Sequence, residues 1–304
     1  LTFRSEAGAH GVYCVVLQPD GKVLAGGYSD ALPVPFLSRL NPDGTWDTSF
    51  EPGLSGLDGF VESIALQTDG KILLGGSLNT PQGQNPIFVA RLNGDSTLDR
   101  SFNPKPENAV DALAVQADGK ILLGGRFVTL NGQIQHYLGR LNNSSPATQS
   151  LNFDGATLTW MRGGASPEVW RTTFEYSSDG VSWTSLGAGV RIPGGWQLTG
   201  LDLPLNTTFR ARGFAVGGMY NGCSWFVETI SAPALAISEA LFSANGQFQF
   251  KANGTAGRVF VVDASPDLST WVPLQTNILS ADPLLFTDLQ SRNFSRRFYR
   301  LRSQ

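Results

Sequence analysis

The stretch Val61-Glu-Ser-Ile-Ala-Leu-Gln-Thr-Asp-Gly-Lys-Ile-Leu-Leu-Gly-Gly76 decides the fold, because the chain repeats it on both sides. Val12 begins an equivalent stretch 49 residues earlier, and Val110 begins another 49 residues later. All three copies share the core Gln-x-Asp-Gly-Lys-[Ile/Val]-Leu-x-Gly-Gly. A fixed period of this length indicates a repeat architecture, in which each copy is one structural unit that stacks on its neighbours.

One repeat unit reads as a small antiparallel sheet. Apolar and polar residues alternate before Asp69-Gly70, which is a two-residue hairpin signal, and a short apolar run closed by two glycines follows it. Residues 88–92 add a third strand, and residues 98–102 add a short fourth strand. Such a sheet has two apolar faces and cannot bury both alone, so the repeats should pack face to face as blades of a β-propeller. The paired glycines then allow close backbone packing at the blade ends.

Two further features recur in register with the repeat. Arg39, Arg91 and Arg140 each precede Leu-Asn, and Asp-x-Ser-Phe follows at Asp47 and Asp99. Together with the Asp-Gly-Lys core, this pattern resembles the delta-60 repeats of secreted and surface bacterial proteins, in three copies over about the first 145 residues. The resemblance implies propeller blades and implies little about chemistry. The recurring arginines themselves predict structural ion pairs with the two aspartates, within or between blades.

Three blades do not close a propeller, which needs roughly four to eight. Residues 146–232 contain further strand and Asp-Gly turn patterns, such as Phe153-Asp-Gly155 ahead of a tryptophan, and we interpret them as two degenerate blades. The prediction is a β-propeller of about five four-stranded blades over residues 1–232, with residues 1–3 as the last strand of one blade. The alternative is a fibronectin type III-like sandwich at 146–232, because Leu198-Thr-Gly-Leu201 ahead of residues 207–212 resembles later strands of that domain.

Residues 233–304 read as a separate unit after a linker at Ser231-Ala-Pro-Ala234. Short strands separated by Asn-Gly and Ser-Pro-Asp turns predict a small β-sandwich-like module. Residues 263–271 and the terminal Arg297-Phe-Tyr-Arg-Leu-Arg302 resemble the short C-terminal β-modules of many secreted bacterial proteins. This resemblance implies a secreted or cell-surface location.

The composition argues against several classes of function. The 304 residues include 22 Lys and Arg against 25 Asp and Glu, a formal net charge of −3, so no general attraction to nucleic acid or anionic lipid is expected. The chain has no run of 18 apolar residues, and we expect no transmembrane segment. His10 and His136 stand in no catalytic or metal-binding motif. Cys14 and Cys223 are expected to be buried thiols, with one disulfide as the alternative.

Acidic residues gather just before or within the first strand of each blade: Glu6, then Asp58 and Glu62, then Glu107 and Asp111. In a propeller the strand nearest the axis lines the central channel, so these carboxylates could surround one rim and hold Ca²⁺ or a polar ligand. The alternative is that they are ordinary solvated loop charges. No other cofactor is expected.

Tryptophan offers a second ligand surface. Five of the seven tryptophans lie between residues 150 and 232, and exposed indoles suit stacking on sugar rings. Trp170 and Trp196 are the best candidates, because Arg, Gly and Pro turn residues neighbour them. The alternative is that both tryptophans belong to the β-sheet core.

Two functions from different classes are consistent with this sequence. The first is a non-catalytic extracellular or cell-surface binding or scaffold protein that recognises a glycan or a surface protein, with Trp170, Trp196, Glu62 and Asp111 as ligand-binding candidates. The second is an extracellular hydrolase, lactonase- or glycosidase-like, that uses a metal or carboxylates at the propeller axis. The first is favoured because the sequence contains no recognisable catalytic constellation.

Overall fold

The computed structural model of the chain describes residues 11–28, 36–54, 58–79, 86–203, 207–216, 224–231, 235–254, 257–280 and 283–303. Apart from one short 3₁₀ helix, η1 (Ser291–Asn293), every regular element in these ranges is a β-strand. No helix in this part of the chain is long and apolar enough to cross a membrane. The predicted all-β class is confirmed, and the predicted strand at residues 1–3 lies outside the described ranges.

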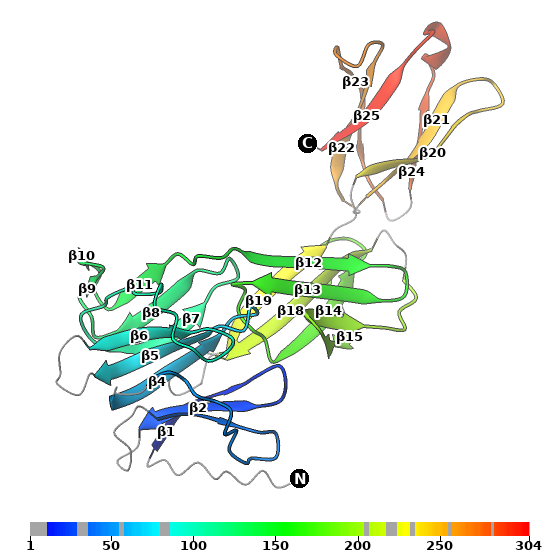
Figure 1. The fold of residues 1–304 in the computed structure, drawn as a ribbon. Helices are drawn as coiled ribbons and strands as arrows, with labels where there is room; N and C mark the ends of the chain where they lie inside the picture. The colour runs from blue at the N-terminus through cyan, green and yellow to red at the C-terminus, as the bar shows by residue number, and fades with distance from the viewer. Residues whose placement is uncertain are drawn as a thin grey trace.

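The N-terminal half forms three antiparallel sheets, one for each repeat, which we call blades 1, 2 and 3 (Figure 1). Blade 1 consists of β1 (Gly11–Leu17), β2 (Val23–Tyr28) and β3 (Phe36–Leu40). Blade 2 consists of β4 (Asp58–Leu66), β5 (Ile72–Asn79) and β6 (Ile87–Leu92). Blade 3 consists of β7 (Val110–Val115), β8 (Ile121–Gly125) and β11 (Leu138–Leu141), and carries a small hairpin of β9 (Thr129–Leu130) and β10 (Gln133–Ile134).

The predicted fourth strand of each blade is reduced to one paired residue. Leu40 pairs with Trp46 in blade 1, and Leu92 pairs with Leu98 in blade 2, as isolated bridges. The chain then turns away, because the carboxylate of the following aspartate accepts the backbone N–H of the serine two residues later, in both blades. The predicted short fourth strand is therefore a single bridge in blades 1 and 2, and the described part of each blade is a three-stranded sheet.

The blades pack face to face, and we call the face toward the preceding blade the leading face and the opposite one the trailing face. Cys14, Val16 and Leu24 on the trailing face of blade 1 share a core with Ile64 and Leu74 on the leading face of blade 2. A second core joins blades 2 and 3 in the same way. The close packing expected of the paired glycines is confirmed, since a Cβ atom on Gly75 would lie 2.9 Å from the carbonyl oxygen of Val110 in the next blade.

Residues 147–231 form a sandwich of two four-stranded sheets. One sheet has the order β12 (Ala147–Phe153), β13 (Leu158–Gly164), β17 (Gly195–Leu198), β16 (Val190–Ile192). The other has the order β15 (Thr184–Ala188), β14 (Arg171–Ser177), β18 (Thr208–Val216), β19 (Ser224–Ser231). Trp160, Phe174 and Phe209 fill one core between the two sheets.

This sandwich corrects the prediction of a five-bladed propeller, and the described residues contain no closed propeller. The physical reason is the alternation of burial along the strands. In blade 2, successive residues of β5 are buried, because neighbouring blades cover both faces of the sheet. In β13, buried Leu158, Trp160 and Arg162 alternate with more exposed residues, so only one face is covered. Two sheets with one apolar face each form a sandwich of the kind left open as the alternative.

Blade 2 and the sandwich are joined through their backbones. The turn after β4 runs beside the segment after β13, where Gln67 and Pro167 form an isolated antiparallel bridge. Thr68 N donates to Ser166 O at 2.9 Å, and Glu168 N donates to Leu66 O at 2.9 Å. The sandwich therefore contacts the turn ends of the blades.

The C-terminal module contains two three-stranded sheets around its own core, which includes Phe250, Phe260 and Phe286. Figure 1 shows it standing apart from the other sheets. One sheet has the order β20 (Ala236–Phe242), β21 (Phe248–Asn253), β24 (Leu284–Asp288). The other has the order β23 (Val272–Ile278), β22 (Val259–Ser265), β25 (Phe298–Ser303).

Candidate functional site

Each blade carries a β-bulge near the start of its first strand. The pairing register shifts between Val12 and Cys14 in β1, and at the equivalent points of β4 and β7. The bulged residues are Tyr13, Glu62 and Asp111. A bulge re-aims the side chain of the extra residue. Because β4 packs against both β1 and β7, this repeat position is where side chains from successive blades can meet.

Two of the predicted acidic residues do meet there. The Glu62 side chain is buried and lies close enough to Asp111 of the next blade for a hydrogen bond between them when one carboxyl group is protonated. Burial, then this hydrogen bond and the negative charge of Asp111, raises the pKa of Glu62 to about 7. The Arg126 Nε atom lies 3.5 Å from Asp111 Oδ2, and its charge opposes the shift. Near neutral pH the Glu62 carboxyl group therefore keeps its proton in a large share of the molecules.

We expect Glu62→Gln to stabilise the protein at about pH 8 by on the order of 2 kcal/mol, and to change its stability little near pH 4.5. The folded pKa of about 7 lies above the ordinary value of 4.5. Protonated Glu62 therefore contributes its full stability to the fold below the ordinary pKa of 4.5, and this contribution is lost as the pH rises through the folded pKa of about 7. Urea unfolding at both pH values measures the effect, with the exposed Glu51→Gln as control. An equal change at both pH values would refute this account.

Of the other acidic residues of the predicted rim, the structure describes the side chain of Glu107, which does not join this pair. Glu107 accepts hydrogen bonds from the backbone N–H groups of Val128 and Thr129, so it holds a turn within blade 3. Glu6 and the side chain of Asp58 lie outside the described parts. In the ranges that the structure describes, no group of three or more His, Cys, Asp or Glu side chains is placed to hold a metal ion. Ca²⁺ takes six to eight oxygen ligands, which is more than the carboxyl groups of Glu62 and Asp111 supply by themselves. Ca²⁺ at this rim therefore stays a prediction.

The two candidate tryptophans lie in different surroundings. Trp170 is exposed and lines an apolar hollow with the ends of the first strands of the blades, including Leu66 and Val115. Trp196 is buried, and the Arg191 guanidinium lies 4.5 Å from its ring centroid. The prediction of an exposed stacking surface is wrong for Trp196, because it pairs across the strands with Trp160 and shares its inward face.

A cavity lies where the sandwich meets the hairpin turns of blades 1 and 2, and we call it the junction cavity. Asp20 and Thr68 line it from the blades, and Arg162, Glu168, Arg191 and Trp196 line it from the sandwich. Arg191 is neutralised, because its Nη1 and Nη2 both donate to Glu168 Oε1 at 3.0 Å. The cavity therefore combines an ion pair, a second guanidinium and the turn carboxylate of Asp20, whose Oδ1 accepts the backbone N–H of Lys22 at 3.1 Å.

Arg162 is the unusual group of this cavity. Its side chain is buried, and neither Nε nor Nη1 has a hydrogen-bond partner among the described residues. Its guanidinium lies 4.8 Å from the centroid of the Trp160 ring. Burial lowers the pKa of Arg162 to about 10; the charge of Glu168 opposes this shift, and that of Arg191 adds to it. The side chain therefore stays protonated at neutral pH, as a buried cation that can accept an anionic partner.

Arg162 was not among the predicted site residues, although the sequence contains a signal for it. Leu158, Trp160 and Arg162 stand two residues apart, so in a strand they share one face. The tryptophan marks that face as the buried one, and an arginine on a buried face needs a partner. The junction cavity itself is not visible in the sequence, because residues from two blades complete its lining.

Cys14 is a free, buried thiol, as predicted. Burial raises its pKa to about 12, so the unreactive thiol form persists at neutral pH. Cys223 lies outside the described residues. His136 is exposed on blade 3, and His10 also lies outside the described part.

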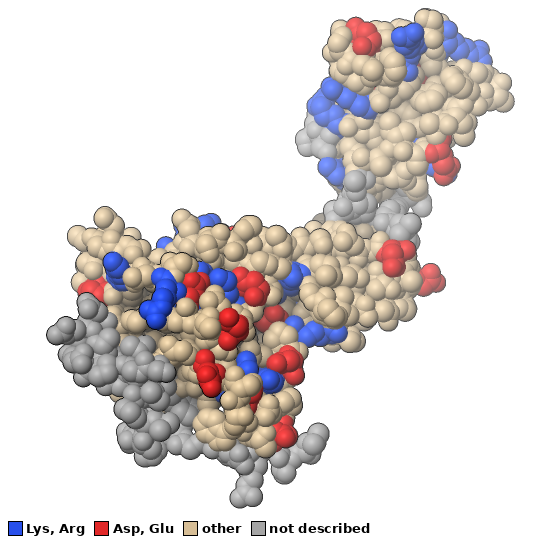
Figure 2. All heavy atoms as spheres, viewed as in Figure 1, with Lys and Arg blue, Asp and Glu red and all other residues tan. Residues whose placement is uncertain are grey.

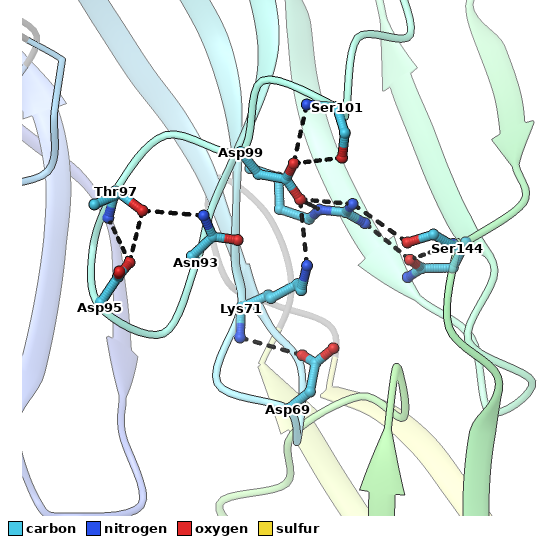
Figure 3. Close-up of polar contacts among 10 residues, drawn as sticks. Asp69, Lys71, Asn93, Asp95, Thr97, Asp99, Ser101 and Ser144 are labelled. Atoms are coloured by element: carbon cyan, nitrogen blue, oxygen red, sulfur yellow. Dashed lines mark hydrogen bonds and ion pairs between the residues drawn. The ribbon is translucent and has the colours of Figure 1, made fainter.

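The recurring arginines form the predicted structural ion pairs in two of the three repeats. Arg39 Nε lies 2.7 Å from Asp47 Oδ2, and Arg91 Nη2 lies 2.8 Å from Asp99 Oδ2. Figure 3 shows Asp99 bonded to Lys71 and Ser101 as well. Arg140 in blade 3 forms no such pair among the described residues, because threonine stands at the equivalent position, Thr148. On the face seen in Figure 2, acidic and basic side chains are interspersed.

Comparison with known proteins agrees with this division of the chain. Residues 18–50, 67–102 and 116–145 match the family model of a domain of unknown function, DUF5122, described as a beta-propeller. The three segments are similar to DUF5122 propeller-type repeats, and each covers the second and third strands of one blade sheet. The DUF5122 segments end just before β12, where the blades give way to the sandwich, and they cover about a third of the chain.

Beyond the DUF5122 repeats, the comparisons add no functional argument. No curated protein matches the chain. Among solved structures, a tetra-tandem repeat in the extending region of a large adhesion protein is 13% identical and covers 89% of this chain and 70% of its own. Its TM-score is 0.21, which is too low to carry an argument about fold or function.

Proposed function

We propose that the protein is a non-catalytic binding protein of the cell exterior that recognises an acidic glycan in the junction cavity. The observation that supports this most directly is Arg162, a buried guanidinium at the cavity whose Nε and Nη1 find no hydrogen-bond partner in the part of the chain that the structure describes. An unpaired buried charge costs several kcal/mol of stability, of the order of 3 to 5. A ligand carboxylate or sulfate would offset this cost by a charge-assisted hydrogen bond.

The other groups of the cavity favour a sugar over a simple anion. Glu168 is already ion-paired with Arg191, and among the described residues no carboxylate forms an ion pair with Arg162. The Asp20 and Glu168 carboxylates are acceptors suited to sugar hydroxyls, and Ile192 and Pro193 add an apolar side. A sugar that carries a carboxylate offers an anion, hydroxyl donors and an apolar face in one ring. Recognition by few polar groups in an otherwise apolar recess is typical of small-ligand sites.

The location outside the cell has separate support. The DUF5122 segments resemble the delta-60 repeats of secreted and surface bacterial proteins, and the C-terminal module resembles modules appended to such proteins. These resemblances concern the framework and carry no information on the ligand. The ligand class rests on the cavity alone.

We expect the protein to bind oligogalacturonides, and Arg162→Met to weaken that binding at least about tenfold, the value of one charge-assisted hydrogen bond. The melting temperature should stay the same or rise, because methionine fills the buried site without an unpaired charge. Isothermal titration calorimetry measures the affinity. The methyl esters of the same oligosaccharides are the matched ligand control, since they lack the negative charge and should bind weakly.

The matched protein control is Arg100→Met, which removes an exposed arginine outside the junction cavity and should leave the affinity unchanged. Equal binding by the wild type and Arg162→Met, or failure of every acidic glycan to bind, would reject the proposed ligand class.

The hydrolase alternative would use Glu62 and Asp111. Glycosidases hold their two carboxyl groups about 5 to 9.5 Å apart, so that a sugar or water fits between them. Here the two carboxyl groups lie within hydrogen-bonding reach of each other. Release of reducing ends from the same oligosaccharides, abolished by Glu62→Gln or Asp111→Asn, would replace the binding proposal by the hydrolase.

A further inference from the structure

The leading face of blade 1 is uncovered, although the same face of the other two blades is buried. Its residues Val12, Val15 and Leu17 are 47%, 46% and 46% exposed. The period of 49 residues identifies their counterparts, none of which is more than 8% exposed: Val61, Ile64 and Leu66 in blade 2, and Val110, Leu113 and Val115 in blade 3. The difference arises because a preceding blade covers blades 2 and 3, and none of the described residues packs on blade 1 in that way.

The trailing face of blade 3 is uncovered in the complementary way. Leu138 is 64% exposed, whereas its counterparts Leu37 and Val89 are 8% and 3% exposed. Arg140 is exposed, whereas its counterpart Arg91 is buried. Ala112 is also exposed, at the position where Cys14 and Ser63 are buried. The described part of the chain thus ends in one uncovered blade face on each side of the three-blade arc.

These two faces are of complementary kinds. Within the chain, a trailing face packs on a leading face twice, once between blades 1 and 2 and once between blades 2 and 3. The uncovered pair consists of one leading and one trailing face built from equivalent repeat positions. Contiguous apolar side chains exposed on a sheet face mark an interaction site.

We propose that a second copy of this chain covers both faces, so that the leading face of blade 1 in each copy packs on the trailing face of blade 3 in the other. Each new contact repeats the packing already present between consecutive blades. Two arcs of three blades give six blades, within the four to eight that close a propeller. The resulting dimer has two-fold symmetry about the propeller axis, and closure limits the assembly to two copies.

The sandwich does not take the place of a fourth blade. It contacts the turn ends of the blades, through the pairing of Gln67 with Pro167. On the trailing face of blade 3 it reaches Ala114, at the apolar hollow that Trp170 also lines. Leu138 and Arg140, farther along that face, remain exposed. The strand faces are therefore accessible to another copy.

We expect the 304-residue chain to sediment as a dimer of about 65 kDa, twice the monomer mass of 32.6 kDa, at micromolar concentration. Val15→Glu and Leu138→Glu should each weaken dimerisation at least about tenfold, since each places a charge in an apolar contact. Both positions are exposed in the single chain, so both variants should keep the wild-type circular dichroism spectrum and melting temperature at low concentration. Val181→Glu, at a position 80% exposed in the sandwich, is the matched control and should remain dimeric.

The proposal also specifies which face contacts which. A mixture of Val15→Glu and Leu138→Glu copies retains one undamaged contact, so it should dimerise more tightly than either variant alone. A dimer joined by two leading faces would leave Leu138→Glu unaffected, and a dimer joined by two trailing faces would leave Val15→Glu unaffected; either outcome overturns the proposal. A monomeric wild type at the highest soluble concentration also overturns it.

Discussion

Arg91→Ala is expected to lower the free energy of unfolding by about 3 to 5 kcal/mol, the usual effect of removing one partner from a buried ion pair. Arg91 is buried, and its Nη2 atom lies 2.8 Å from Asp99 Oδ2. Its Nη1 atom donates to Asn143 Oδ1 at 2.8 Å, which ties blade 2 to the segment that leads into the sandwich. Without the guanidinium, the largely buried Asp99 keeps only Lys71, at 3.3 Å, as a cationic partner.

Arg140→Ala is the control for this prediction, because Arg140 occupies the same repeat position in blade 3 and is exposed. At a surface site the loss should stay within about 0.5 kcal/mol. Urea unfolding at low protein concentration, followed by far-ultraviolet circular dichroism, measures both variants. Equal losses for Arg91→Ala and Arg140→Ala would show that the ion pair and its link to Asn143 do not stabilise the blades.

Leu74→Ala is expected to cost about 2 to 5 kcal/mol, the range for removing a fully buried leucine side chain. Leu74 is fully buried on the leading face of blade 2, in the core shared with blade 1. Because the neighbouring backbones are held in sheets, the cavity left by the substitution can collapse only in part. The melting temperature and urea unfolding measure the loss.

The comparison variant for Leu74 is Ile134→Ala, which truncates an exposed side chain of similar size in blade 3. It should change stability by less than about 0.5 kcal/mol. A loss of that size for Leu74→Ala as well would mean that the blades are not held together by the core described above.

The sequence was sufficient for features that depend on neighbours along the chain. The Asp-Gly turns, the strands on either side of them and the paired glycines follow from local backbone preferences and from the repeat. The Arg91 and Asp99 pair was also predictable, because the two residues stand eight positions apart on adjoining segments of one blade. The period likewise places Tyr13, Glu62 and Asp111 at one repeat position, although it does not show that two of them touch.

What covers each sheet face was decided only by the tertiary structure. A strand pattern states which side chains share a face, but not which sheet packs on that face. Residues 147–231 therefore read equally well as blades or as a sandwich, and only the assembled core around Trp160 distinguishes the two. The close approach of Glu62 to Asp111 and the cavity around Arg162 arise in the same way, from elements far apart in sequence. The exposure of Val15 beside the burial of Ile64 has the same cause, because identical local patterns differ in burial when only one of them has a covering neighbour.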